Sequence, residues 1–360
     1  MSLEVIYVTR HGFRSPWSVD PSTGNYTASV RSPTKLPTDP ALASHGVEQA
    51  NELATHLLEV DPPIDQVYSS PYYRCMQTIQ PFVHNLRRIQ AQPSGNVSGI
   101  LPSRIRVDLG LSEWYGSAHF EHPSSAPLDE LQSFFPEIDA DYASSLAPPR
   151  NGESLSQLHD RVAKVIESII RRSDQDGHKA ILVCTHAAVV IALGRVLTGQ
   201  IERDFGAFTC GLSKYRRQRS SNVKTRIGSS SGTGTKSMVP AARDERRIGE
   251  TRSQAPPQID HAGNADPHPQ ESRWPGLGSP RRGESGLYGG WICELDSDCS
   301  FLSGGEERGW KFSGDESFLE TDNSGSWRSN VALESSTGVD GPRIERHDSH
   351  INQAVGTSKL

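Results

Sequence analysis

The chain begins MSLEVIYVTRHGFRSPW (residues 1–17), in which an apolar run leads directly into Arg10 and His11. Residues 3–9 are rich in β-branched side chains, which is typical of a buried β-strand. Arg10 and Arg14 place two cations around the imidazole at the end of this strand. Because like charges repel, such a cluster is costly unless an anionic group is present to bind it. The stretch therefore predicts an anion-binding loop at a strand end.

The first 212 residues alternate between strand-like and helix-like segments. The expected strands are residues 3–9, 66–70, 104–108 and 179–184, and the expected helices are residues 45–60, 73–88, 152–172 and 187–197. Ser44 is the expected N-cap of the first helix, and Pro81 is expected to kink or restart the second. Strands that alternate with helices indicate an α/β domain, whose ligands bind at the carboxyl ends of the strands.

Polar side chains follow all four expected strands. They are Arg10, His11, Ser70, Arg74, Glu113 and His186. A single residue of this kind is readily explained as a structural group. Because the carboxyl ends of neighbouring parallel strands share one edge of a sheet, we expect these side chains to form one site.

Six motifs carry a family resemblance. They are VTRHG (8–12), LASHGVEQA (42–50), YSSPYYRCMQT (68–78), LSEWYG (111–116), GESLSQLHDRV (152–162) and VCTHAAVV (183–190). In this order they resemble branch 1 of the histidine phosphatase superfamily, also called phosphoglycerate mutase-like, from about residue 5 to about residue 212. The resemblance implies a three-layer α/β/α phosphoglycerate mutase-like domain over residues 1–212. The composition of the later residues adds a largely disordered C-terminal tail.

The resemblance implies that His11 is a nucleophile that forms a phosphohistidine. An imidazole suits this role when one ring nitrogen is free and the other is held. Gly12 is expected to leave room for the ring and to donate a backbone hydrogen bond to it. Arg10 and Arg74 are expected to clamp the phosphoryl oxygens, with a further hydrogen bond from His186. Neither a metal nor another cofactor is required.

Glu113 lies in the motif that resembles the family's proton donor. A general acid needs a pKa near the working pH, and burial beside Trp114 and Tyr115 is expected to raise the pKa of this carboxyl. A surface carboxylate is the alternative interpretation.

Two further residues are candidate phosphate contacts. Arg14 completes an RHGxR pattern similar to acid-phosphatase-like members, and we expect it to be a third phosphate cation, with a peripheral salt bridge as the alternative. Ser70 either hydrogen-bonds the phosphate or caps a turn.

Residues 107–149 form the expected cap insertion, which contains no Lys or Arg. Its eight acidic residues are Asp108, Glu113, Glu121, Asp129, Glu130, Glu137, Asp139 and Asp141. An acidic cap repels polyanions, whereas a mutase must hold a second anionic group of its substrate. We therefore expect a phosphatase acting on a phosphorylated small molecule or phosphoprotein with a neutral or cationic remainder.

Aromatic residues near this cap offer a place for an aryl group such as phosphotyrosine. They are Trp17, Trp114, Tyr115, Phe134 and Phe135. Packing in the core is the alternative role for each of them.

The remainder of the chain has another composition. Residues 213–285 are rich in Ser, Gly, Pro and Arg without periodicity, which predicts a disordered linker. Its basic run at 214–226 is either a flexible arm or a nuclear-import or nucleic-acid-contacting tract. Residues 286–320 regain aromatic and acidic residues and are a candidate protein-binding segment, whereas 321–360 are expected to be disordered.

RHGFRSPW (10–17) and the long tail also resemble the fungal tau55-type subunits of the transcription factor TFIIIC. This resemblance implies a second hypothesis, a non-catalytic or weakly catalytic scaffold subunit in a nuclear complex. Measured hydrolysis of p-nitrophenyl phosphate distinguishes the two.

The composition of the whole chain limits its location. The formal net charge is −6, and the five cysteines are scattered without framework spacing, which favours reduced thiols. No apolar run is long enough for a bilayer, and the expected first strand leaves no room for a signal peptide. We therefore expect a cytoplasmic or nuclear protein that is not membrane-bound.

Overall fold

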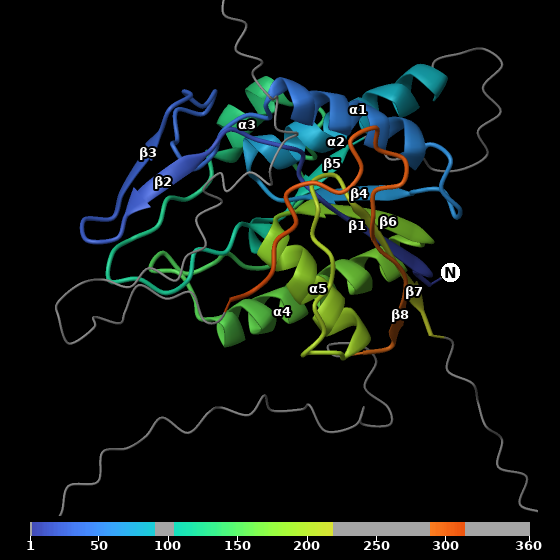
Figure 1. The fold of residues 1–360 in the computed structure, drawn as a ribbon. Coiled ribbons are helices and arrows are strands. Elements are labelled where there is room, and N and C mark those ends of the chain that lie inside the picture. The colour runs from blue at the N-terminus through green and yellow to red at the C-terminus, as the bar shows by residue number, and fades with distance from the viewer. Residues whose placement is uncertain (1, 91–103, 219–288, 314–360) are drawn as a thin grey trace, which may run out of the picture. The chain divides into compact units, whose positions relative to one another are not determined.

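A computed structural model describes residues 2–90, 104–218 and 289–313 (Figure 1). A six-stranded sheet has the order β5-β4-β6-β1-β7-β8. Its strands are β1 (Val5–Arg10), β4 (Gln66–Ser69), β5 (Ile105–Val107), β6 (Ala180–Thr185), β7 (Leu212–Arg217) and β8 (Trp291–Asp298). The first four are parallel, β7 runs antiparallel to β1, and β8 runs antiparallel to β7. The carboxyl ends of β1, β4, β5 and β6 therefore lie along one edge.

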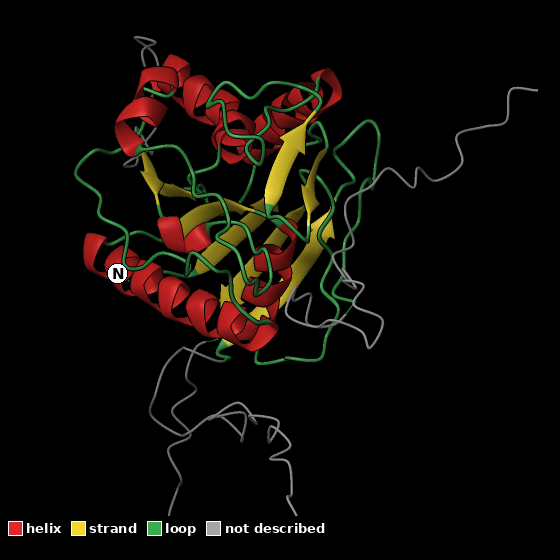
Figure 2. Ribbon diagram, turned by 90° about the vertical axis from the view of Figure 1, so that its left-hand side faces the viewer, coloured by secondary structure: helices red, strands yellow, loops and turns green. Residues whose placement is uncertain are grey.

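Helices cover both faces of the sheet (Figures 1 and 2). One face carries α1 (Ser44–Leu57), α2 (Tyr73–Gln90) and α3 (Leu128–Phe134), and the other carries α4 (Leu155–Asp176) and α5 (Ala187–Thr198). The buried strand β1 alternates between two cores, since Val5 and Tyr7 pack in one while Ile6 and Val8 pack in the other. The expected three-layer α/β/α architecture is confirmed.

Local signals at helix ends are partly as expected. Ser154 caps α4 with a reciprocal bond to Gln157, whereas α1 is preceded by Ala43 without a side-chain cap, so the expectation for Ser44 was wrong. The helix α2 continues through Pro81 and does not restart there. A hairpin of β2 (Trp17–Asp20) and β3 (Asn25–Ala28) has no counterpart in the predicted elements.

The folded unit extends beyond the expected boundary at residue 212. Strand β7 pairs with β1 and buries Tyr215, and β8 pairs with β7 and buries Trp291. Residues 289–313 therefore belong to the same folded unit as the N-terminal part. The sequence pattern missed β7 because Lys and Arg occupy its partly exposed positions.

Two carboxylates form ion pairs with the three basic residues in the described part of the basic run 214–226. Lys214 and Arg216 contact Glu294 at 3.4 and 2.5 Å, and Arg217 contacts Asp174 at 2.9 Å. The remaining basic residues, most of the expected linker and the expected disordered tail lie outside the described residues. The helices of the described ranges are all too short or too polar to cross a lipid bilayer.

Candidate active site

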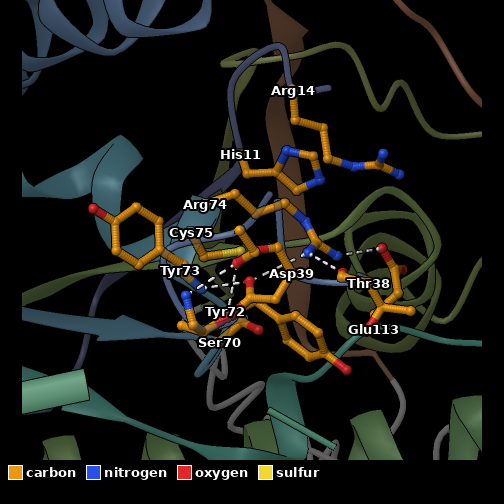
Figure 3. A network of polar contacts seen from close by, with 12 residues as sticks. His11, Arg14, Thr38, Asp39, Ser70, Tyr72, Tyr73, Arg74, Cys75 and Glu113 are labelled. Carbon is orange, nitrogen blue, oxygen red and sulfur yellow. Dashed lines mark hydrogen bonds and ion pairs between the residues drawn. The ribbon is translucent and has the colours of Figure 1, made fainter. Parts of the chain in front are cut away.

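Loops at the carboxyl edge of the sheet bring the six sequence-predicted polar residues together. Arg10 ends β1 and His11 follows it. Ser70 and Arg74 follow β4, Glu113 follows the 3₁₀ turn Leu109–Leu111, and His186 follows β6. The ring centroids of His11 and His186 are 5.4 Å apart, and both side chains are buried. Figure 3 shows His11 next to the guanidinium of Arg74, with Glu113 beside it.

The backbone holds the ring of His11 in one tautomer. Its Nδ1 lies 2.8 Å from the carbonyl oxygen of Gly12. A carbonyl only accepts, so Nδ1 carries the proton and the Nε2 lone pair remains available. Burial, together with Arg74, Arg10, His186 and Arg14, holds the pKa of His11 well below its usual range. The imidazole is therefore neutral at physiological pH.

Gly12 contributes differently from expectation. It accepts from the His11 ring, and its own N–H donates to Thr78 Oγ1 at 3.0 Å. A Cβ at this position would lie 2.8 Å from the carbonyl oxygen of Gly46. Glycine is required here by the close approach of α1.

Arg74 is completely buried and held from several sides. Its Nη1 donates to the carbonyl of Thr38 at 2.9 Å and lies 3.6 Å from the carboxylate of Asp39. Its Nη2 donates to Glu113 Oε2 at 3.2 Å, and the guanidinium lies 4.6 Å from the ring centroid of Tyr72. Among the described residues, its buried Nε has no hydrogen-bond partner. This unsatisfied donor favours an additional acceptor in the site.

Glu113 contacts two basic side chains, those of Arg74 and His186. Its Oε2 lies 3.1 Å from His186 Nδ1, which is also 3.1 Å from Arg74 Nη2. Although burial raises the pKa of Glu113, the charges of His186, Arg74 and Arg14 outweigh burial and lower it. The expectation of a raised pKa was wrong for this state of the site, because the combined effect of these charges exceeds that of burial, although burial is the largest single influence.

His186 is fixed through both ring nitrogens. In addition to Nδ1, its Nε2 hydrogen-bonds Ser70 Oγ at 2.7 Å and lies 3.6 Å from Cys75 Sγ. Burial opposes protonation, but Cys75 and Glu113 together raise the pKa of His186. Ser70 thus orients a site imidazole, a role that neither sequence interpretation included.

Arg14 lies at the edge of the site. Its Nη1 donates to the carbonyl of Ser15 at 3.1 Å, and its guanidinium lies 5.6 Å from the ring of Trp17. Its charge lowers the pKa values of both His11 and Glu113. Figure 3 places this guanidinium on the side of His11 where Glu113 lies.

A cavity of about 180 Å³ adjoins Glu113. Its walls include Tyr72, Tyr115, His122, three prolines of the cap and Ala147. Of the five aromatic residues expected near the cap, Tyr115 lines this cavity. The ring of Trp114 instead packs in the core, where Nε1 donates to the carbonyl of Glu153 at 2.7 Å.

The acidic residues of the cap do not line this cavity, apart from Glu113. The pairs are Glu121 with Arg150, Glu137 with His84 and Arg87, Asp139 with Arg104 and Arg106, and Asp108 with Gly110 and Tyr142. Cations and donors outside the expected cap or elsewhere in the loop bind these carboxylates, so the acidic composition of the cap does not give this cavity an acidic wall. The walls of the cavity beside Glu113 are mainly apolar.

Sequence reasoning missed the residues that support the clamp. Asp39 is fully buried, and its Oδ1 accepts from the backbone N–H of Tyr73 at 2.8 Å. Burial raises the pKa of Asp39 to about 6. No motif marks Thr38 or Asp39, whereas Tyr72 lies inside the quoted motif 68–78, two residues before Arg74.

Three site residues have atoms close enough to bind one metal ion. Ligand atoms of His11, Glu113 and His186 all lie within 4.8 Å of one another. The Arg74 guanidinium contacts two of the three, and Arg10 and Arg14 add further positive charge. This charge favours an oxyanion over a metal cation.

Sequence comparison identifies relatives of known description. The chain is 33% identical over 203 residues to the transcription factor tau 55 kDa subunit of Saccharomyces cerevisiae. This alignment covers 55% of the present chain and 42% of the yeast protein. It is 31% identical over 222 residues to the ecdysteroid-phosphate phosphatase of Drosophila melanogaster. That alignment covers 55% of the present chain and 27% of the Drosophila protein. The chain therefore spans less than half the length of these curated relatives.

The comparisons also include solved structures and a family model. The ecdysone phosphate phosphatase of Bombix mori in complex with tungstate is 21% identical, with a TM-score of 0.43 over 59% of this chain and 89% of that chain. The model of the histidine phosphatase superfamily, branch 1, matches residues 6–229, which is more than half of the chain. With the two imidazoles and buried arginines gathered at the sheet edge, this match makes the chain a member of branch 1 of the histidine phosphatase superfamily.

Proposed function

We propose that this chain is a phosphatase that hydrolyses a phosphate monoester through a phosphohistidine on His11. The observation that carries the proposal is the contact of His11 Nδ1 with the carbonyl oxygen of Gly12, which leaves Nε2 free in a site with several buried arginines. A lone pair on Nε2 next to buried guanidinium groups is suited to attack a phosphate dianion.

The charges of the site suggest how the proton reaches the leaving group. A bound phosphate takes hydrogen bonds from Arg74 and His186 that otherwise stabilise the carboxylate of Glu113. It also adds negative charge beside that carboxylate, and both effects raise the pKa of Glu113. Glu113 then binds a proton before the chemical step.

The proposed reaction has two steps. The His11 Nε2 lone pair forms a bond to phosphorus while the bond to the alcohol oxygen breaks, and Glu113 gives its proton to that oxygen. Water then attacks the phosphohistidine and loses its proton to Glu113, so that inorganic phosphate leaves and His11 is neutral again. Arg10, Arg14 and Arg74 stabilise the phosphoryl oxygens in both steps.

The apolar cavity beside Glu113 supports a substrate with a neutral, apolar remainder. Arg150 is the cation in its lining, and that side chain pairs with Glu121 at 2.5 Å. A polyanionic substrate therefore finds little compensation there, which makes a mutase reaction less favourable. The relative named for an ecdysteroid phosphate is consistent with this substrate class.

A second candidate is a scaffold subunit of a nuclear transcription complex with weak or no turnover. The specific observation is the 33% identity to the yeast transcription factor tau 55 kDa subunit. In this case the chain is nuclear and has protein partners, and the phosphate site is retained without a physiological substrate.

Hydrolysis by the full chain and its His11→Ala variant tests the proposal. We expect the chain to hydrolyse p-nitrophenyl phosphate and esters with an apolar remainder faster than bisphosphorylated sugar acids. His11→Ala should lose activity on the order of 10³-fold or more, because the nucleophile is removed. Quenching in alkali should trap phosphate on the wild-type chain and not on the variant.

A matched control is His119→Ala, which removes an exposed histidine of the cap. Its activity should equal that of the wild type. Equal rates for wild type and His11→Ala, together with recovery of transcription-complex subunits on the full chain, would favour the scaffold function instead.

A further inference from the structure

We infer that residues 306–312, here called the C-terminal strap, position Arg10 for phosphate binding. This inference rests on the proposed function of the site. The strap follows β8 in the chain, and in Figure 1 its orange trace runs near α1 and then back toward α5. It is separated from Arg10 by almost the whole sequence.

The strap supplies an acceptor for the buried guanidinium of Arg10. Nη1 of Arg10 donates to the backbone carbonyl of Arg308 and to that of Ala207, the latter at 2.9 Å. Arg10 is only 1% exposed. A buried guanidinium needs acceptors with good geometry, so these carbonyls restrict its orientation.

Glu307 anchors the strap to α1 and to the chain before β7. Its carboxylate accepts from Gln49 Nε2 at 2.8 Å and lies 2.6 Å from His45 Nε2. Its carbonyl accepts from the backbone N–H of Thr209 at 3.1 Å, and Thr209 forms a β-bridge with Arg10. Side-chain and backbone bonds of one residue therefore hold the strap next to the clamp.

The backbone of Arg308 has an uncommon conformation. Its φ is 50°, a left-handed value that glycine adopts easily and β-branched residues adopt only at a cost. Its guanidinium lies 4.5 Å from the ring centroid of Phe13, two residues after His11. The conformation of this one residue thus determines where the carbonyl that faces Arg10 lies.

The far end of the strap packs near the candidate acid. The ring of Phe312 lies 5.4 Å from that of Trp114 and 4.9 Å from the guanidinium of Arg195. Trp310 lies 6.5 Å from Trp114. Trp114 follows Glu113 directly in the chain. The strap therefore contacts Arg10 at one end and the neighbour of the candidate acid Glu113 at the other.

Two substitutions at one position test the inference in the full chain. Arg308→Val and Arg308→Gly both remove the guanidinium, but only valine opposes the left-handed backbone. We expect Arg308→Val to lower kcat/KM for p-nitrophenyl phosphate roughly ten- to hundredfold, since small misplacement of a catalytic clamp has such effects. Arg308→Gly should retain most of the activity that the valine variant loses, and Glu306→Ala, at an exposed neighbour, should match the wild type.

Affinity for inorganic phosphate provides a readout that does not depend on turnover. Calorimetry should show phosphate bound more weakly by Arg308→Val than by Arg308→Gly, with the thermal midpoints of both variants showing that the fold is kept. If Arg308→Val unfolds, Glu307→Ala, which removes the anchor, is compared with Glu306→Ala in the same way.

The outcomes separate the inference from the proposed function. Equal phosphate affinities of the valine and glycine variants, or of Glu307→Ala and Glu306→Ala, would overturn positioning by the strap even in an active enzyme. Weaker phosphate binding of the valine variant in a chain without turnover supports the strap and removes the phosphatase function. A wild-type chain that binds no phosphate overturns both.

Discussion

At the scale of single residues, the site keeps an uncharged imidazole, that of His11, among cations. His11 is surrounded by Arg10, Arg14 and Arg74, and burial adds to their effect on its pKa. Protonation of His11 would place another positive charge in this group, which is why the neutral ring is favoured. His186, Arg74 and Arg14 lower the pKa of Glu113, which keeps this carboxyl ionised in the free site.

The role of Glu113 leads to a prediction that depends on the leaving group. Glu113→Gln removes the proposed proton donor, so hydrolysis of an alkyl phosphate should slow by about 10²–10⁴-fold. Hydrolysis of p-nitrophenyl phosphate should slow less than about tenfold, because its weakly basic leaving group needs little protonation. Steady-state kinetics of both esters checks this.

The contrast between the two esters is the informative quantity. A similar loss for both would mean that Glu113 orients Arg74 and His186 and does not protonate the leaving group. Binding of inorganic phosphate by the variant controls for damage to the clamp.

At the scale of elements, one buried histidine joins the β2–β3 hairpin to the cap. His122 Nε2 lies 3.0 Å from the carbonyl of Gly116, so Nε2 carries the proton and Nδ1 accepts from the Tyr26 hydroxyl at 2.5 Å. Burial lowers the pKa of His122 from 6.5 to about 4. A protonated ring cannot accept from Tyr26.

This contact predicts a dependence of stability on pH. Above pH 6.5 the ring is neutral in both the folded and the unfolded chain, and the contribution of His122 is fully present. As pH falls toward 4, the unfolded chain takes up the proton first, so the free energy of unfolding decreases, by about 2 kcal/mol at pH 5 from this group. His122→Gln should lack this part of the loss.

Urea unfolding at neutral pH and at about pH 5 measures the difference. The other buried histidines are present in both proteins, so the comparison isolates His122. His119→Gln, at an exposed position nearby, should behave as the wild type. An identical decrease for His122→Gln and wild type would contradict the lowered pKa.

At the scale of the whole molecule, the sheet is completed by strands from opposite sides of a long connection. Gln218 donates its N–H to the carbonyl of Gly290 at 2.8 Å, so the end of β7 lies next to the start of β8. The connection between β7 and β8 therefore has only a short distance to span, from residue 218 to residue 289. The fold requires β7 and β8, since Tyr215 and Trp291 are buried in its core.

Replacing residues 219–288 by a Gly-Ser turn of about four residues should therefore keep fold and activity. Shortening the connection reduces the entropy of closing it, which should stabilise the folded chain by about 2 kcal/mol. Thermal unfolding and p-nitrophenyl phosphate hydrolysis measure this. The contrasting variant is a chain that ends at residue 212, which lacks all but the first residue of β7 and the whole of β8 and should not fold. A folded and active product of that length would contradict the role of these two strands.

Much of the fold and the centre of the site follows from the sequence, because both depend on patterns within short stretches. The apolar run before Arg10 and His11 is local, as is the periodicity of the helix before the strand of residues 179–184. Parallel topology then places the residues that follow each strand at one edge. This is why His11, Arg74 and His186 were found together.

Only the tertiary structure decided which charges meet. The carboxylates of the cap look available along the chain, but Arg87, Arg104 and Arg150 bind three of them. The pKa of Glu113, the buried Asp39 behind the clamp and the carbonyl of Arg308 on Arg10 likewise depend on distances across the fold. Electrostatic and hydrogen-bond energies vary with those distances, which residue spacing does not encode.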